Sequence, residues 1–250
     1  MPTVQDRVKP WGQMTTYPEH WQSAIEASFL ARLPLETREG LLQHAREVNA
    51  APKTILYAES AGRPESPHLV LVLDGLIRVF RTSRSGREVT VRHARTGDVL
   101  GLPSIIAQAS PAAAQAVVAS KVIVMSAQIL RSRAQHDSQL AWAIAEEMAG
   151  SLFNIQERLA HNVLAPVRSR VARYLLDVAV RQGTHSVAAL RHEDIAAAIG
   201  TVREVVARTL TAFRSEGLIR RDDGRIVLVD VGKLRQIAQA DEFADFRIRP

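Results

Sequence analysis

The chain has 250 residues, 46% of them hydrophobic, and its 32 Lys and Arg against 26 Asp and Glu give a formal net charge of +6 at pH 7. This length allows two modest domains, and the basic balance favours polyanionic partners such as nucleic acid. The absence of cysteine excludes disulfides and thiolate-bound zinc or iron–sulfur centres, and without a long apolar run or a signal-peptide pattern we expect a cytoplasmic protein with no membrane partner.

The chain begins with a segment that holds several prolines and polar residues. We expect residues 1–20 to form a loose N-terminal arm. Aromatic residues that could pin this arm to the body are Trp11, Tyr17 and Trp21. Short helical patterns follow over residues 24–33 and 35–48.

From about residue 51 the hydrophobic period changes toward two, which is typical of half-buried strands. Turn signals at Asp74-Gly75, Ser85-Gly86 and Thr96-Gly97-Asp98 separate the apolar stretches. The strand-like segments span residues 53–58, 68–82, 87–94, 97–102 and 114–127. Many short strands with glycine turns predict an antiparallel roll or barrel, and we expect this domain to span residues 21–135.

One long helix is predicted over residues 136–162. Its apolar residues recur at a mean spacing of about 3.5, which is typical of a coiled-coil seam. We interpret it as a dimerisation helix whose interface is formed by Leu140, Ile144, Met148, Ile155 and Leu159. The alternative is an ordinary amphipathic helix that lies on its own roll.

A second domain is predicted over residues 163–250. Pro166 breaks one helix and can start another, so we expect a hinge near residues 161–166. Another helix is predicted over residues 167–181. Its inward-facing residues should be Val171, Leu175 and Val178.

Residues 191–230 predict a helix, a tight turn, a second helix and a short two-stranded wing. In the first helix Ile195, Ala198 and Ile199 recur at helical spacing. Gly200 follows them, where a left-handed turn residue is wanted. Asp223-Gly224 is a hairpin signal at the expected tip of the wing.

The second helix of this unit carries the candidate DNA contacts. Thr201 can cap it, with Glu204 three residues later in capping-box position. Arg203, Glu204 and Arg208 share the outward side. In a major groove, arginine donates to guanine O6 and N7, and glutamate accepts from cytosine N4. The residues expected to face inward are Val205, Val206, Leu210 and Phe213, and the candidate DNA contacts are Thr201, Arg203, Glu204, Val205 and Arg208.

The chain from about residue 30 to about residue 238 resembles the cyclic-AMP receptor protein and FNR family of bacterial transcription regulators. Arg203, Glu204 and Arg208 match the family's R-E-x-x-x-R, and residues 217–219, G-L-I, match its turn into the wing. Residues 71–101 are similar to the family's β-roll. The glycines expected at the corners of that roll are Gly75, Gly86, Gly97 and Gly101.

This resemblance implies an α+β fold with an N-terminal β-roll like the cyclic-nucleotide-binding fold, a long dimerisation helix and a C-terminal winged helix-turn-helix. It also implies a homodimer that binds double-stranded DNA at palindromic TGTGA-like half-sites and works with RNA polymerase. A small-molecule effector would shift the population between two arrangements of the domains.

The sensor pocket lacks the family's grips for cyclic AMP. Leu102 and Pro103 stand where the ribose-binding glutamate should follow Gly101, and Ala113-Ala114 stand where the phosphate-clamping arginine and serine should be. A buried phosphate needs a cation and hydrogen-bond donors. We therefore expect an effector other than cyclic AMP, or none. The candidate effector pocket, of apolar character, is formed by Leu102, Pro103, Ser104, Ala113 and Ala114, with Ile105, Ile106 and Val117 nearby.

Two alternatives stay open at this point. A haem-based gas sensor of the same family would use an N-terminal proline, and Pro2 is present, but its histidine would fall within residues 102–104, which hold none. A β-roll adaptor that docks a ligand or peptide without binding DNA would leave Arg203 and Arg208 unexplained. No histidine pair has metal-site spacing, and neither a G-x-S-x-G elbow nor a phosphate loop occurs, so we expect no enzyme.

Overall fold

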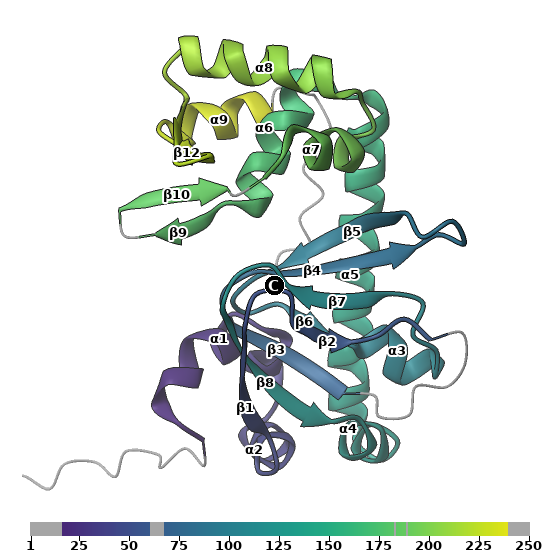
Figure 1. Ribbon diagram of the computed structural model, residues 1–250. Coiled ribbons are helices and arrows are strands. Elements are labelled where there is room, and N and C mark those ends of the chain that lie inside the picture. The colour runs from purple at the N-terminus through teal and green to yellow at the C-terminus, as the bar shows by residue number, and fades with distance from the viewer. Residues whose placement is uncertain (1–16, 61–67, 183, 189, 240–250) are drawn as a thin grey trace, which may run out of the picture.

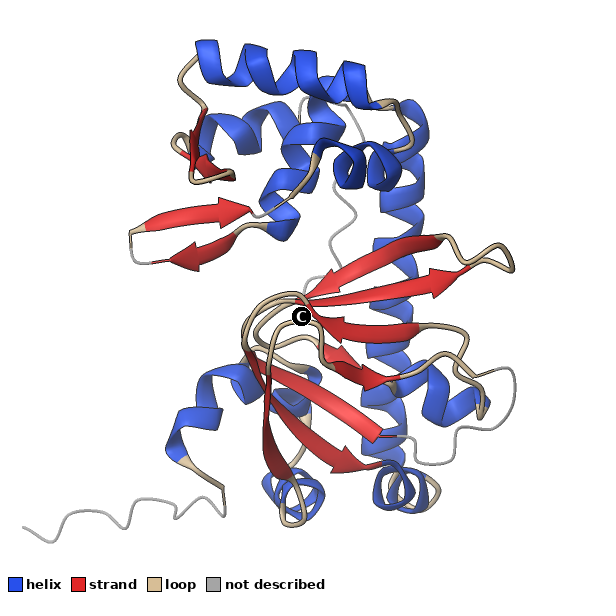
Figure 2. Ribbon diagram, viewed as in Figure 1, coloured by secondary structure: helices blue, strands red, loops and turns tan. Residues whose placement is uncertain are grey.

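The computed structural model describes residues 17–60, 68–182, 184–188 and 190–239. It has the α+β architecture predicted from the sequence: a β-roll, a long helix along one side of it, and a second domain above the roll (Figure 1; Figure 2). Most of the predicted N-terminal arm, including Trp11, lies outside the described residues. Tyr17 and Trp21, at its end, are buried against the roll as expected.

Four short helices open the first domain. They are η1 (Glu19–Trp21), α1 (Gln22–Glu26), η2 (Phe29–Arg32) and α2 (Leu35–Leu42). The helix predicted over residues 35–48 is therefore too long. It stops at Leu42 because residues 46–50 form β1 (Arg46–Ala50), which pairs antiparallel with β8 (Ser120–Ser126). A partner strand distant in sequence overrides the weak helical pattern here.

The roll consists of two antiparallel four-stranded sheets, β1-β8-β3-β6 and β2-β7-β4-β5. The remaining strands are β2 (Ile55–Tyr57), β3 (His68–Asp74), β4 (Ile77–Thr82), β5 (Glu88–Ala94), β6 (Val99–Leu100) and β7 (Ala113–Ala116). The four corner glycines named above all have positive φ. Glycine is essential at position 101 for a second reason, because a Cβ there would collide with the carbonyl oxygen of His68.

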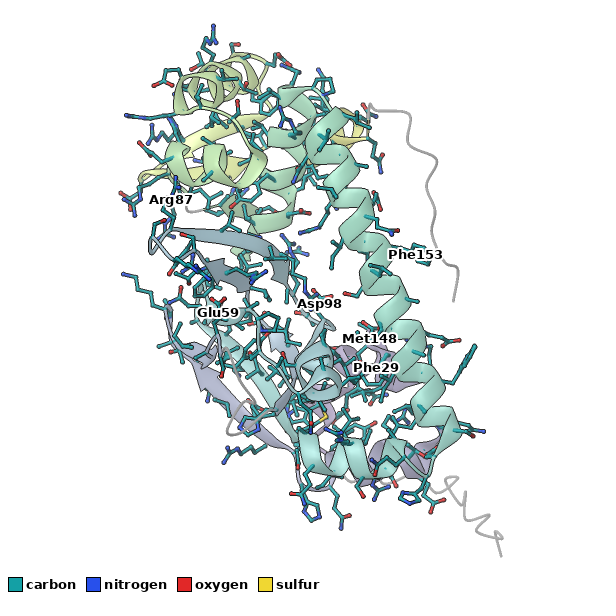
Figure 3. The ribbon with its side chains drawn as sticks, turned by 90° about the vertical axis from the view of Figure 1, so that its right-hand side faces the viewer. Phe29, Glu59, Arg87, Asp98, Met148 and Phe153 are labelled. Atoms are coloured by element: carbon teal, nitrogen blue, oxygen red, sulfur yellow. The ribbon has the colours of Figure 1, made fainter. Side chains whose placement is uncertain are left out.

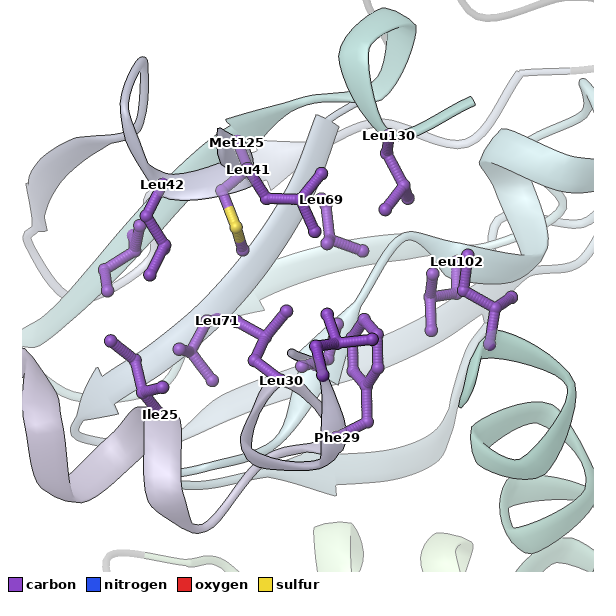
Figure 4. Packing of buried hydrophobic residues seen from close by; sticks show 14 of the residues in the cluster. Ile25, Phe29, Leu30, Leu41, Leu42, Leu69, Leu71, Leu102, Met125 and Leu130 are labelled. Carbon is purple, nitrogen blue, oxygen red and sulfur yellow. The ribbon is translucent and has the colours of Figure 1, made fainter. Parts of the chain in front are cut away.

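A hydrophobic core joins the roll to its helices (Figure 4). Phe29 and Leu30 of η2 pack with Leu69 and Leu71 of β3, and all four are almost fully buried. Two further helices close this side of the roll, α3 (Leu102–Ala107) and α4 (Ala127–Ala134).

The long helix, α5, runs from Ser138 to Leu164. The carboxylate of Asp137 caps it by accepting the backbone N–H groups of Gln139 and Leu140, each at 3.0 Å. Its first half lies on its own roll: Leu140 and Ile144 are buried in the core of Figure 4, and Met148 packs against that core beside Phe29 (Figure 3).

This arrangement corrects the predicted dimer seam. Leu140, with no exposed surface, and Ile144, 7% exposed, cannot contact another molecule because their own subunit covers them. Ile155 and Leu159 are 46% and 65% exposed. The single stripe expected from the sequence is divided. The first half of α5 packs on the roll, whereas Leu152, Ile155 and Leu159 in its second half are exposed.

The second domain begins with α6 (Val167–Val178), whose N-cap is Pro166, inside the predicted hinge. The predicted inward residues of α6 are buried as expected. The helix ends three residues earlier than predicted, because β9 starts at Val180. The other elements are β9 (Val180–Gln182), β10 (His185–Ala188), α7 (His192–Ile199), α8 (Arg203–Ser215), β11 (Ile219–Asp222), β12 (Arg225–Leu228) and α9 (Val231–Ala238). The four strands form one sheet in the order β11-β12-β10-β9.

Candidate nucleic-acid interface

Helices α7 and α8 form a helix-turn-helix with a left-handed turn residue between them. Gly200 has φ 66° and ψ 50°, as its position after the apolar run predicted. The backbone N–H groups of Gly200 and Thr201 both donate to the carbonyl of Ala196, which closes the end of α7. Ile195 and Ile199 of α7 are buried in the core of this domain.

The predicted capping box of α8 is not formed. The N-cap of α8 is Val202, which provides no side-chain cap. Thr201 sits one residue too early because its backbone already belongs to the turn that ends α7. A carboxylate caps α7 instead: Asp194 accepts the backbone N–H of Arg191 at 3.2 Å. Glu204 is consequently not tied back to the helix N-terminus.

One face of α8 is buried and the other is open to solvent. Val206, Leu210 and Phe213 pack inside the domain, as predicted, whereas Val205 is half-buried. Arg203, Glu204 and Arg208 are exposed. The helix lies at the end of the molecule farthest from the roll (Figure 1), so this charged face is accessible to a duplex.

The side chain of Arg203, at the start of α8, forms an exposed ion pair with Glu193 of α7. Its Nε lies 3.0 Å from Oε1 of Glu193 on α7, and both side chains are more than half exposed. The pKa of Glu193 lies below its ordinary value, through a hydrogen bond with its own backbone first and the charge of Arg203 among the further causes. An ion pair this exposed contributes little to stability, so Arg203 can exchange Glu193 for another acceptor.

The wing follows α8 as the sequence predicted. Gly217, with φ 74°, turns the chain into β11, and the β11–β12 turn carries Asp223 and Gly224 with positive φ. Arg220 and Arg221 stand exposed on β11. The sequence prediction missed the β9–β10 hairpin, which extends the wing to four strands; its short strands carry too few residues for a visible alternation.

Both halves of the chain match families of known domains. Residues 47–137 match the cyclic nucleotide-binding domain, and residues 169–237 match the Crp-like helix-turn-helix domain. The transcriptional regulator LdrP of Thermus thermophilus is 32% identical over 181 residues, which are 70% of this chain and 89% of that protein. The cyclic AMP receptor protein of the same organism is 29% identical over 206 residues, or 82% of this chain and 93% of that protein.

Solved structures agree with these sequence relatives. A CRP-family transcriptional regulator from Thermus thermophilus superposes with a TM-score of 0.60 and 27% identity, covering 78% of this chain and 96% of that chain. FixK2 from Bradyrhizobium japonicum shares the fold, with a TM-score of 0.63, 24% identity, and coverage of 77% and 96%.

The chain belongs to the CRP/FNR family. As a member of this family it is a DNA-binding transcription regulator and not an enzyme. In the part of the chain that the structure describes, no helix is long and apolar enough to cross a membrane. The same residues contain no cluster of three His, Cys, Asp or Glu side chains placed to hold a metal ion.

The candidate effector residues of this CRP/FNR regulator lie at the start of α3 and on β7. Leu102 starts α3 and is buried in the core of Figure 4, whereas Ala114 of β7 is buried among the valines inside the roll. Ala113 is also buried, Pro103 is exposed and Ser104 is half-buried. None of these five side chains carries a charge.

Three arginines on or next to β4 and β5, Arg78, Arg92 and Arg95, have hydrogen-bond partners within the structure. Arg78 donates to Gln115 at 2.8 Å and to Glu88 at 2.6 Å. The other two bind backbone carbonyls: Arg92 donates to that of Val99 at 2.9 Å, and Arg95 reaches the end of α6 in the second domain.

Proposed function

We propose that this regulator reads palindromic DNA through Arg203, Glu204 and Arg208 of α8, at half-sites like TGTGA. The observation that carries the proposal is the exposure of these three side chains on one accessible face of a helix whose opposite face is buried. Two arginines can each donate a bidentate pair to a guanine, and Glu204 can accept from a cytosine amino group. Thr201 and Val205, half-exposed at the start of the helix, are candidates for further contacts.

The proposed functional unit is a homodimer that pairs through the second half of α5. Leu152, Ile155, Leu159 and Val163 recur at spacings of three and four residues, and each is more than 45% exposed. An exposed apolar stripe of this length is unfavourable in water, and pairing with the same stripe of a second copy would bury it. Two-fold symmetry of the protein then matches the palindrome, with RNA polymerase as the further partner expected for a transcription regulator.

The proposed effector differs from cyclic AMP. The relatives include a cyclic AMP receptor protein, yet Leu102 and Ala113-Ala114 offer no charge to a cyclic phosphate, and Arg78, Arg92 and Arg95 have other partners. Control by another small molecule would act through the relative population of domain arrangements.

Base readout is tested by replacing one arginine on α8 and one on the wing. Arg203→Ala should weaken binding to a TGTGA palindrome by roughly 1–3 kcal/mol and relax the preference at one base position. Arg221→Ala, on the exposed side of β11, should weaken all sequences alike, because we expect it to meet phosphate. Fluorescence anisotropy with matched and single-mismatch duplexes measures both. Equal loss on every duplex for Arg203→Ala would make Arg203 a phosphate contact and end the readout proposal.

A further inference from the structure

Helix α5 carries a second exposed apolar face besides the stripe proposed to pair two copies. Phe153 and Leu164 are 47% and 65% exposed, and Figure 3 shows Phe153 on the side of α5 away from the roll. They are eleven residues apart, about three turns of helix, and therefore share one face. At about 100° per residue, both lie roughly 120–140° around the helix from Leu159 of the pairing stripe. This lateral face of α5 is formed by Phe153, Gln156, Ala160 and Leu164.

A second copy of α5 can cover the pairing stripe or the lateral face, but not both. The two together extend over roughly half of the helix circumference, from Ile155 to Leu164. A two-stranded coiled coil buries only the narrow seam between its helices. The roll of the same chain leaves Phe153 and Leu164 exposed as well. These side chains are therefore unfavourable in water unless a further segment packs on them.

The last described helix, α9, ends near one end of the lateral face. The hydroxyl of Ser169, in the first turn of α6, donates to the backbone carbonyl of Ala238 at 3.2 Å, and both residues are buried. Ser169 is only five residues beyond Leu164, so the backbone between them spans at most about 18 Å. The chain therefore leaves its described part close to the C-terminal end of α5.

The residues that follow have the length and the composition to cover the lateral face. Residues 240–250, which we call the tail segment, read ADEFADFRIRP and lie outside the described residues. Their large apolar side chains are Phe243, Phe246 and Ile248. Eleven extended residues reach up to roughly 36 Å, whereas the lateral face is about 16 Å long at 1.5 Å per residue. The tail segment can thus reach from Ala238 to Phe153.

We propose that the tail segment packs along the lateral face of α5, with its phenylalanines against Phe153 and Leu164. Burial of apolar surface on both partners drives this contact. The tail segment follows α9 of the DNA-binding domain, whereas α5 lies before the bend at Ala165-Pro166. The contact therefore bridges that bend and stabilises one arrangement of the two domains. It involves neither the exposed face of α8 nor the pairing stripe.

The accessibility of one introduced thiol tests the proposal, because the chain contains no cysteine of its own. Gln156 is exposed and lies one turn from Phe153 and from Ala160 on the lateral face. The rate at which Gln156→Cys reacts with 4,4′-dithiodipyridine, a neutral reagent, is measured in the full chain. Adding Phe243→Asp and Phe246→Asp should raise this rate at least about tenfold, since burial of unpaired carboxylates on an apolar face is costly.

Asn154→Cys is the matched control. Asn154 is exposed and points about 160° around the helix from Gln156. Its reaction rate should be the same with the original and the substituted tail segment. If the two aspartates prevent folding, Phe243→Ser with Phe246→Ser replaces them, with the same expectation.

Three results would overturn the proposal. One is an equal rate for Gln156→Cys with the original and the substituted tail segment. Another is an equal rise in Asn154→Cys, because the whole helix would then be loosened. The third is loss of the difference in an added Ile155→Asp background, chosen to separate two copies, because the protection would then come from the partner; a difference that persists there supports packing within one chain. No measurement uses DNA, so failure here and failure of base readout are distinguishable.

Discussion

His93 shows how tertiary burial changes the chemistry of one residue. His93 lies on β5, whose residues alternate between the two faces of the sheet. In the fold it is packed against Tyr174 and faces arginines of both domains, and its pKa falls to about 4. Burial, as the main cause, and the negative charges of Asp194 and Asp177, as smaller causes, raise the pKa of Tyr174 to about 12.

The lowered pKa of His93 predicts a loss of stability in acid. Above pH 6.5, the ordinary pKa of the unfolded chain, the ring is neutral in the folded and the unfolded state, so it does not make the free energy of unfolding depend on pH. Between 6.5 and about 4 the unfolded chain binds a proton that the folded chain refuses, so the free energy of unfolding falls, by at most roughly 3 kcal/mol. Urea unfolding from pH 7 to pH 4 should show a steeper fall for the original chain than for His93→Gln. Parallel curves would contradict the prediction.

Leu102 and Ala113-Ala114 predict insensitivity to cyclic AMP. An anionic phosphate that enters an apolar wall loses water without gaining charge-assisted hydrogen bonds, each worth about 1.5–3 kcal/mol. Isothermal titration with cyclic AMP should therefore show no micromolar binding. The cyclic AMP receptor protein of Thermus thermophilus serves as the positive control. Micromolar affinity together with a matching gain in operator affinity would show that the roll holds the nucleotide by other groups.

At the scale of elements, α5 illustrates both the strength and the limit of periodicity. The sequence predicted the helix and its apolar residues, but the spacing of apolar residues does not reveal which part of the protein packs against each turn of the helix. The roll covers Leu140 and Ile144, whereas Ile155 and Leu159 are exposed. The capping prediction at Thr201 failed for a similar reason: the backbone of the preceding turn had already used that residue.

The exposed half of α5 gives the prediction at this scale. Ile155→Asp places two carboxylates in an apolar seam, where burial without a partner is costly, so the chain should become monomeric and lose operator affinity. Asn154→Asp adds the same charge at an exposed neighbouring position and should leave the dimer intact. Analytical ultracentrifugation measures both variants. A dimer of unchanged affinity in Ile155→Asp would locate the interface elsewhere.

At the scale of the whole molecule, Arg95 connects the two domains. From the roll, its guanidinium donates to the carbonyls of Leu176 at 2.7 Å, Asp177 at 3.1 Å and Ala179 at 3.0 Å, at the C-terminal end of α6. A cation is favourable there, because the last carbonyls of a helix lack partners and carry its negative dipole end. Leu76, also from the roll, is buried in the core of the second domain.

Arg95→Gln should therefore loosen the junction. Three hydrogen bonds to a charged donor are lost, but the freed carbonyls can bind water, so we expect a decrease of roughly 1–3 kcal/mol in the free energy of unfolding. Arg87→Gln removes an equal charge from an exposed turn and should change stability little. Urea unfolding followed by tryptophan fluorescence compares them. Equal stability of the two variants would mean that Arg95 does not hold the domains together.

The sequence by itself determined the fold class, the glycine corners of the roll, the long helix and the helix-turn-helix with Arg203, Glu204 and Arg208 outward. These features depend on local periods and turn chemistry, which are readable within a few residues of chain. Only the tertiary structure decided that β1 is a strand, that the two halves of α5 have different surroundings, and that Arg95 of the roll reaches the end of α6. Those outcomes depend on contacts between residues far apart in sequence, and no local pattern records them.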